Sequence, residues 1–205
     1  MPLEAGFVAA VADTRLDYVW FPHDAVISAV VTTPEGDTLE VGLLGFEGMT
    51  GQALLLGEDR SAMTMVVQIP GFASRMRAAD FVREVVGRDG DTRRLLLRFT
   101  NAYLAVLAQV SACNADHSVE QRLARWLVMA HDRVGRDHFR LTHEFMAMMI
   151  GVRRASVTAV AGALRDAGAI AYVKGHVTIL DRARLESRAC ACYQAIGDRI
   201  EAVFS

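Results

Sequence analysis

The sequence predicts an α+β fold in which an antiparallel β-barrel or jelly-roll-like domain precedes a helical half. Runs rich in β-branched residues fill the chain as far as Arg77, and helical periodicity dominates from Ala78 onward. The chain has 205 residues, 52% hydrophobic and 22% charged, which is typical of globular proteins and excludes a disordered chain. We place the domain boundaries at residues 1–90, 91–115 and 116–205.

The first half contains three strand-like runs. Residues 25–33 and 38–44 flank a Pro-Glu-Gly-Asp stretch, and proline and glycine favour a turn there, so the two runs are predicted to pair as a hairpin. Residues 62–69 form a third run, which stops at Pro70-Gly71. These features favour an antiparallel sheet domain, which we expect to bind an effector.

A long helix is predicted from Asp91 to about Asn114. Apolar residues recur along it at spacings of three and four, which is typical of a coiled-coil seam. The seam consists of Leu96, Phe99, Tyr103, Val106, Val110 and Cys113. We expect this seam to form a homodimer interface, with a second apolar line through Leu97, Leu104 and Ala108 left for other packing. The alternative is a long core helix inside a monomer.

Two helices joined by a glycine turn stand out in the second half. Thr142 caps the first helix, Gly151 ends it, and the next helix covers residues 152–167. This order predicts a helix-turn-helix, whose second helix enters the major groove of DNA with its first residues against base edges. The small side chain of Ala147, four residues before the glycine, allows the two helices to approach closely.

A small hairpin follows the helix-turn-helix. Residues 169–173 and 176–180 flank a turn at Lys174, which suits a wing that touches the DNA backbone or the minor groove. A helix capped by Ser118 precedes the helix-turn-helix, and one uninterrupted helix from about Asp181 to Val203 is predicted to close the chain. The second half therefore predicts a winged helix-turn-helix domain with a C-terminal helix.

The candidate DNA-binding residues are cations and hydroxyls at the two caps and in the wing. Arginine can pair with two acceptors of guanine in the major groove, and hydroxyls can bind phosphate or bases. The candidates are Thr142, Arg153, Arg154, Ser156, Thr158 and Lys174. The net charge of the chain is −2, but residues 137–184 carry +3 and residues 1–110 carry −5. Double-stranded DNA is therefore the expected partner, although the net charge of the whole chain is negative.

The order of barrel, seam helix, helix-turn-helix and wing resembles that of the Crp/Fnr family of bacterial transcription regulators, over roughly Tyr18 to Asp181. Its most specific part is residues 117–127 followed by the helix-turn-helix. The resemblance implies a homodimer that binds a two-fold DNA site and contacts RNA polymerase. It places Arg154 where many members carry a base-reading arginine, whereas Ala155 replaces a frequent glutamate. Only 17 residues precede Tyr18, so we expect either that the first domain is short at its N-terminus or that the protein starts further upstream.

The same resemblance indicates effector-binding residues. Family members that bind cyclic nucleotides hold the ribose and phosphate with a Gly-Glu pair and an Arg-Ser pair. The residues that resemble remnants of these pairs are Gly45, Glu47, Arg60 and Ser61. Glu47 and Arg60 lie 13 residues apart, which is longer than the usual spacing, and Leu107 and Ala108 stand where cyclic-AMP binders tend to place hydroxyl residues. Both departures disfavour a cyclic nucleotide, so the signal is unidentified.

No cofactor is expected from the cysteines and histidines. The cysteines are Cys113, Cys190 and Cys192, an odd, sparse set that favours a reducing cytoplasm over a disulfide framework. They are fewer than the four ligands of an iron–sulfur cluster, and we expect neither such a cluster nor haem. The spacing of the histidines at 131, 138 and 143 crosses a loop, so no metal site is expected from them either.

Other function classes receive less support. No phosphate-binding loop or nucleophile elbow is present, so we do not expect an enzyme. No run of about 18 apolar residues is free of charge, so no membrane partner is expected. The alternative to a DNA-binding regulator is a dimeric small-molecule-binding module or enzyme, in which the barrel is the functional part and DNA is not bound.

Overall fold

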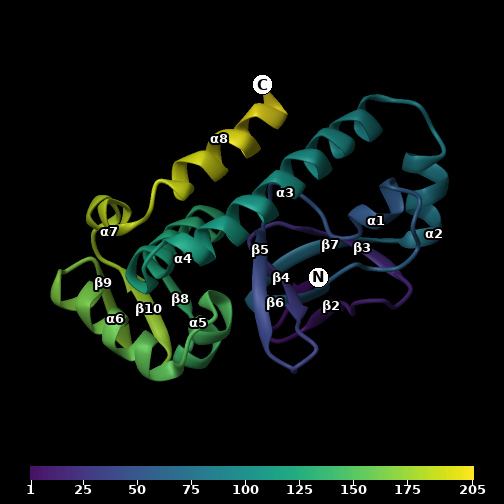
Figure 1. Ribbon diagram of the computed structural model, residues 1–205. Coiled ribbons are helices and arrows are strands. Elements are labelled where there is room, and N and C mark those ends of the chain that lie inside the picture. Colours follow the sequence, from purple (N-terminus) through teal and green to yellow (C-terminus); the bar gives the residue numbers. More distant parts are fainter.

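The computed structural model describes residues 1–205 and consists of an N-terminal sheet domain, a long helix and a helical C-terminal domain (Figure 1). One sheet has the strand order β1-β7-β3 and the other β2-β6-β4-β5, with antiparallel pairing throughout. The strands are β1 (Pro2–Leu3), β2 (Val8–Ala10), β3 (Tyr18–Pro22), β4 (Val26–Thr32), β5 (Thr38–Leu44), β6 (Thr64–Ile69) and β7 (Gly71–Arg77). Side chains of both sheets share one core, so the α+β prediction is confirmed as a jelly-roll-like pair of sheets rather than a closed barrel.

The expected hairpin is present, but the sheet domain has more strands than the sequence predicted. β4 and β5 pair with Thr32 opposite Thr38. β7 was not expected because its sequence, Gly71–Arg77, contains no β-branched residue. The segment before Tyr18, which was expected to leave the domain short, supplies β1 against β7 and β2 against β6.

The long helix α3 (Asp91–Asp116) follows α1 (Gln52–Leu55), α2 (Ala78–Phe81) and a π-helical turn (Val82–Val86). The assignment of its seam to a dimer interface is corrected by burial within the single chain. Leu96, Phe99, Tyr103, Val106, Val110 and Cys113 all pack inside the protomer. Both domains need an apolar surface to close their cores, and this line of α3 supplies it. Leu104, on the second line, is 53% exposed.

By length and composition alone, α3 is the one helix apolar enough to cross a membrane. Its apolar line is nevertheless occupied by packing against the rest of the chain, as in the core helix of a folded domain. The two helices of the predicted helix-turn-helix, taken together, are also long and apolar enough, but they are bent by 104° relative to each other.

The C-terminal domain begins with α4 (Val119–Val134). Ser118 and Gln121 form a capping box at its start, and Gly135 ends it with a φ of 62°. The helices α5 (His143–Ile150) and α6 (Arg154–Asp166) follow, with a sheet of order β8-β10-β9 beside them. Its strands are β8 (His138–Arg140), β9 (Ile170–Val173) and β10 (His176–Ile179). The predicted wing hairpin is confirmed and gains a third strand.

The prediction of a single C-terminal helix is wrong. The chain forms α7 (Arg182–Arg188), an extended break at Ala189, and α8 (Cys192–Phe204). α7 packs on α4, whereas α8 runs alongside α3, as Figure 1 shows for the yellow helix above the teal one. One straight helix cannot follow both surfaces, and the break brings Cys190 and Cys192 toward α3.

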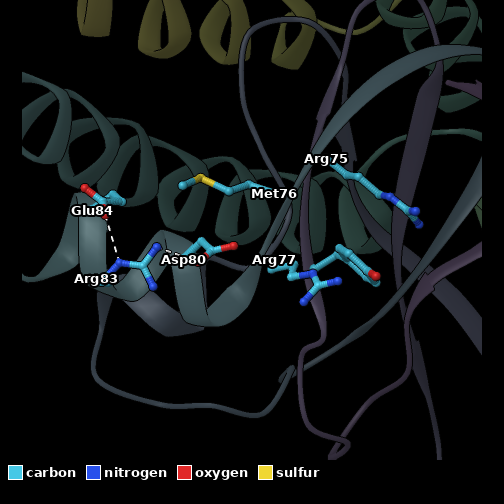
Figure 2. A pocket seen from close by; sticks show the side chains of 7 residues that line it. Arg75, Met76, Arg77, Asp80, Arg83 and Glu84 are labelled. Atoms are coloured by element: carbon cyan, nitrogen blue, oxygen red, sulfur yellow. Dashed lines mark hydrogen bonds and ion pairs between the residues drawn. The ribbon is translucent and has the colours of Figure 1, made fainter.

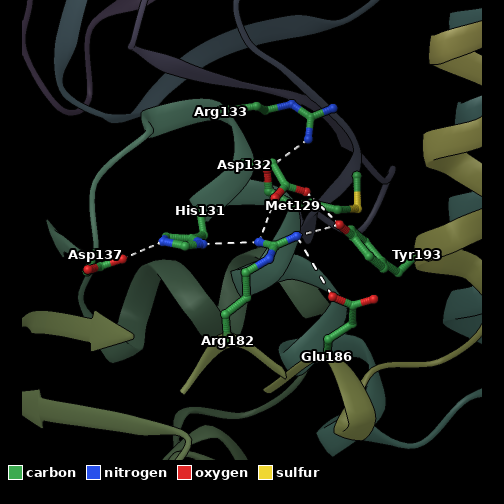
Figure 3. Close-up of polar contacts among 8 residues, drawn as sticks. All are labelled: Met129, His131, Asp132, Arg133, Asp137, Arg182, Glu186 and Tyr193. Atoms are coloured by element: carbon green, nitrogen blue, oxygen red, sulfur yellow. Dashed lines mark hydrogen bonds and ion pairs between the residues drawn. The ribbon is translucent and has the colours of Figure 1, made fainter. Parts of the chain in front are cut away.

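A polar network fixes α7 and α8 onto α4 (Figure 3). The Arg182 guanidinium lies 2.6 Å from a carboxylate oxygen of Asp132 and donates a hydrogen bond of 2.8 Å to the Tyr193 hydroxyl. His131 lies between Arg182, at 3.1 Å, and Asp137, at 2.7 Å. These partly buried contacts connect both C-terminal helices to α4.

Candidate nucleic-acid interface

The helix-turn-helix has the geometry that its sequence predicted. Thr142 Oγ1 accepts a hydrogen bond of 3.3 Å from the Phe145 amide and so caps α5. Gly151 adopts a φ of 63°, a left-handed conformation that favours glycine, and lets the chain turn at the end of α5. The axes of α5 and α6 then differ by 104°, within the range of about 90–120° found in helix-turn-helix motifs.

One face of α6 is buried and its N-terminal end is open. Val157, Ala161 and Leu164 anchor the helix in the core of the domain. Arg153 and Arg154, at the start of the helix, are exposed. A recognition helix needs this arrangement, because the anchored face sets the orientation while the free side chains reach the groove.

The predicted hydroxyls differ in how free they are. Ser156 is half-buried on the first turn of α6. Thr142 is engaged as the α5 cap, and Thr158 Oγ1 lies 3.1 Å from both His143 Nδ1 and the Arg154 carbonyl oxygen. Thr142 and Thr158 therefore help to build the motif, in addition to any contact with a ligand.

The wing places its lysine by a tight two-residue turn. Lys174 and Gly175 have φ values of 48° and 81°, and two successive positive φ angles match the right-handed twist of a two-residue hairpin. The Lys174 side chain is exposed at the tip. β8 adds exposed Arg140 to the same end of the sheet, since Arg140 pairs with His176. The charge count alone did not distinguish Arg140 from the other cations.

Thr142, Arg154 and Lys174 line one open groove of about 400 Å³ between the helix-turn-helix and the wing. Two residues that the sequence did not indicate complete it: His143 stacks on Tyr172, with ring centroids 4.2 Å apart. Burial, followed by the charge of Arg154, lowers the pKa of His143, so its imidazole is neutral at physiological pH. The groove therefore combines two cations with a neutral stacked pair.

The basic charge of residues 137–184 is only partly available to a ligand. Arg182 is engaged in the network of Figure 3, Arg184 donates to the Ala167 carbonyl oxygen at 2.7 Å, and Arg165 pairs with Asp166 at 2.8 Å. The exposed cations of this segment that have no carboxylate closer than 4.0 Å and no hydrogen bond to a carbonyl oxygen are Arg140, Arg153, Arg154 and Lys174. Their nearest acidic contact joins Arg154 to Glu144 at 4.0 Å between two exposed side chains, which is a weak pair.

The predicted effector residues do not come together. The Glu47 carboxylate lies 2.8 Å from Nη2 of Arg133 on α4, and both side chains are buried. Gly45 lies beneath the arginine stem, where a β-carbon would approach the Arg133 side chain to 2.6 Å. The Gly-Glu pair is therefore a junction between the sheet domain and α4, which corrects its assignment to a ligand site.

Arg60 and Ser61 line a separate cavity of about 200 Å³ between the sheet domain and α3. Arg60 Nη1 donates to the Asp13 carbonyl oxygen at 2.6 Å, and the cavity walls are mostly apolar, including Met63, Leu104 and Leu107. A cavity with one tethered arginine and no glutamate from the Gly-Glu pair does not match the pattern expected for a ribose phosphate.

A second buried contact joins the two domains. Glu40 on β5 accepts hydrogen bonds from Ser28 and from Trp126 Nε1, the latter at 2.9 Å. Burial raises the pKa of Glu40 to about 7, although both hydrogen bonds and the charges of Arg125 and Arg133 act in the opposite direction. α4 thus holds the sheet domain through one ion pair, at Glu47, and one titratable carboxyl group.

Another basic surface lies on the sheet domain, at the junction of β7 and α2 (Figure 2). Arg83 is paired with Asp80 and Glu84 at 2.6 and 2.8 Å, and the Arg75 guanidinium stacks 4.4 Å from the centre of the Tyr18 ring. Arg83 and Arg75 therefore already have partners within the sheet domain. None of the residues predicted to bind DNA or an effector lines this surface.

The comparisons with known proteins agree with this geometry. Residues 121–188 match the family model described as the Crp-like helix-turn-helix domain. No curated protein matches the sequence. TTHB099, a CRP-family transcriptional regulator from Thermus thermophilus, is 18% identical in sequence, and its structure matches with a TM-score of 0.74 over 92% of this chain and 96% of that one.

Two further solved structures show the same architecture. FixK2 from Bradyrhizobium japonicum is 13% identical, with a TM-score of 0.72 over 93% of this chain and 96% of that one. CLP from Xanthomonas campestris, a c-di-GMP responsive global regulator, is 13% identical, with a TM-score of 0.62 over 88% and 93%. Residues 121–188 thus match the Crp-like helix-turn-helix domain, and the chain as a whole shares the fold of these solved transcription regulators.

Proposed function

We propose that the protein is a sequence-specific transcription regulator that binds a two-fold DNA site as a homodimer. The observation that carries this proposal is the convergence of Arg154, Thr142 and Lys174 on one open groove of a Crp-like helix-turn-helix domain. In this proposal α6 enters the major groove, Arg153 and Arg154 meet base edges or phosphates, and the wing lysine contacts the backbone. The proposed role is binding, without catalysis.

The homodimer forms through the exposed line of α3 in this proposal. Leu97, Asn101, Leu104, Ala108, Ser111 and Ala115 follow one another at spacings of four and three along this helix. Leu104 is 53% exposed, and the opposite side of the helix is already used by the chain's own core. A parallel or crossed pair of α3 helices then sets the distance between two recognition helices, which must engage half-sites about 34 Å apart.

The signal enters through the cavity between the sheet domain and α3. Gln52 Nε2 and the Tyr103 hydroxyl line it and are buried without hydrogen-bond partners, so a small, mostly apolar ligand with an acceptor group fits its chemistry. Leu104 belongs both to this cavity and to the proposed dimer line. A ligand that moves α3 would therefore change the arrangement of the two copies. A cytoplasmic location and contact with RNA polymerase belong to the same proposal.

Salt-dependent DNA binding tests the proposed function. Each phosphate contact contributes a slope of about −0.9 to the dependence of log affinity on log salt, so binding of genomic fragments is expected to weaken steeply as salt rises. Arg154→Ala is expected to weaken specific binding by about 1–3 kcal/mol and to relax preference at one base pair. The control is Arg165→Ala, at the paired, C-terminal end of the same helix. Absence of binding to every fragment at low salt would exclude the regulator and favour a sheet-domain binding module.

A further inference from the structure

Three cysteines and one histidine meet where α3 ends and α8 begins. Cys113 lies near the end of α3, His117 follows it before α4, and Cys190 and Cys192 flank the start of α8. The three Sγ atoms and one ring nitrogen all lie within 4.8 Å of one another. Cys113 Sγ is 3.4 Å from Cys190 Sγ, and Cys192 Sγ is 3.8 Å from His117 Nδ1.

This geometry points to a single tetrahedral metal ion, and we propose that the four residues form a structural zinc site. Zinc–sulfur bonds of about 2.3 Å place two thiolates of a tetrahedral site about 3.8 Å apart, close to the distances seen. Cys3His is a common ligand set for structural zinc, and thiolate with imidazole selects a soft or borderline ion over calcium or magnesium. An iron–sulfur cluster spreads its thiolates over several irons and needs more room between them.

The surroundings of the cluster fit a metal–thiolate centre. The three cysteines are buried and His117 is half-buried, so the ligand set is largely shielded from solvent. The Gln109 side-chain amide donates a hydrogen bond of 3.2 Å to Cys192 Sγ. Such outer contacts orient a metal-bound thiolate and stabilise its charge.

Charge gives a second argument. Three thiolates and a neutral imidazole around Zn²⁺ carry a net charge of −1. Arg125 is 2% exposed, has no acidic partner at salt-bridge distance, and its side chain has one hydrogen bond, to Met129 Sδ, with Nε unpartnered. Arg125 lies close enough to Cys113 for its charge to act on the sulfur. A buried cation that acts on the cluster complements a negatively charged centre.

A metal ion at this site would link three segments near the connection between the two domains. The ion joins the end of α3 and the residue before the α4 cap to the start of α8. Because α8 lies along α3, the site would fix the C-terminal helix and limit movement of α4 relative to α3. This site is separate from the cavity beside Leu104, and the inference does not depend on the proposed DNA binding.

Metal analysis of the full-length chain, purified under reducing conditions without chelator, tests the proposal. We expect one zinc per protomer. After replacement by Co²⁺, we expect thiolate-to-cobalt charge-transfer bands and the intense visible absorption of a tetrahedral site. Removing zinc with a chelator is expected to lower the melting temperature. A wild-type chain that binds no zinc and shows no cobalt–thiolate bands would overturn the proposal, as would a Cys113–Cys190 disulfide whose reduced form still takes up no metal.

Variants assign the ligands. Cys192→Ser and His117→Ala are expected to lose most of the zinc, and Gln109→Leu to weaken its affinity about 10-fold. His138→Ala is the matched control, because His138 lies exposed in the wing, stacked on His176. Equal zinc content in all four variants would place the metal elsewhere and contradict the site. If a serine variant fails to fold, cobalt titration of the wild type still decides, since its bands report thiolate coordination directly.

Discussion

The buried arginines of α4 and the exposed arginines at the start of α6 are the same type of residue in opposite environments. Arg133 has a side chain only 9% exposed and lies 2.8 Å from Glu47. Arg154 is 69% exposed, and its nearest carboxylate lies 4.0 Å away. The first is committed to a contact within the protein, whereas the second is free to meet a ligand. Burial and partner distance therefore separate arginines that hold the domains together from those proposed to bind DNA.

The largest effect is expected at the buried pair. Glu47→Ala leaves Arg133 buried without its partner, which costs about 3–5 kcal/mol of unfolding free energy. Chemical denaturation measures this loss. The matched control is Asp59→Ala, which breaks the exposed pair with Arg15 and should change stability by no more than about 1 kcal/mol. Equal effects of the two substitutions would contradict the difference between buried and exposed arginines.

The second effect is a pH dependence set by Glu40, the other contact between α4 and the sheets. The pKa of Glu40 is about 7 in the folded protein, against 4.5 for an ordinary glutamate. Between these values the folded state keeps a proton that the unfolded state releases. The unfolding free energy contributed by Glu40 therefore falls by about 3 kcal/mol as the pH rises from 4.5 to 7.

Glu40→Gln should remove this slope and leave the protein more stable than the wild type above pH 7. Denaturation midpoints across the pH range measure the effect, with exposed Glu144→Gln as the control. A glutamine variant that keeps the wild-type slope would assign the pH dependence to another group.

The next effect concerns the two faces of α3. Leu104→Glu places a charge on the exposed line and should weaken the homodimer at least about tenfold, because the charge must be buried on association. Light scattering across protein concentrations measures this change. Phe72→Glu, at an exposed apolar residue of β7, is the control and should leave the dimer intact. A dimer that tolerates Leu104→Glu would place the interface elsewhere.

The smallest effect is expected at the wing tip. Lys174→Gly removes one cation but suits the positive φ at that position, so the unfolding free energy should change by less than about 1 kcal/mol. The salt slope of DNA binding should become shallower by about 0.9. An unchanged slope would mean that the wing does not reach a phosphate.

Much of the fold followed from local signals in the sequence. Caps at Ser118 and Thr142, glycine turns at Gly135 and Gly151, and the β4–β5 hairpin were all predictable, because each depends on neighbouring residues. Which line of α3 faces the protein's own core was not predictable, because both lines have helical spacing and only the packing of two domains decides between them.

The candidate sites show the same limit. The exposure of Arg153, Arg154 and Lys174 was predictable, because a helix-turn-helix and a wing expose the first turn of the second helix and the tip of the hairpin. Glu47 was misassigned because its partner, Arg133, lies 86 residues away in the chain. The meeting of Cys113 with Cys190 and Cys192 was missed because it depends on the break before α8, which the apolar periodicity did not reveal.

Genomic DNA-capture sequencing of the tagged protein, beside its Arg153→Ala/Arg154→Ala double variant, tests the central claim most directly. The exposed arginines have no strong partner within the protein, so the double variant should keep the wild-type melting temperature. We predict that the wild type enriches a shared two-fold sequence and that the double variant loses this enrichment. Recovery of the same fragments by both proteins would contradict the claim that the exposed arginines of α6 read DNA.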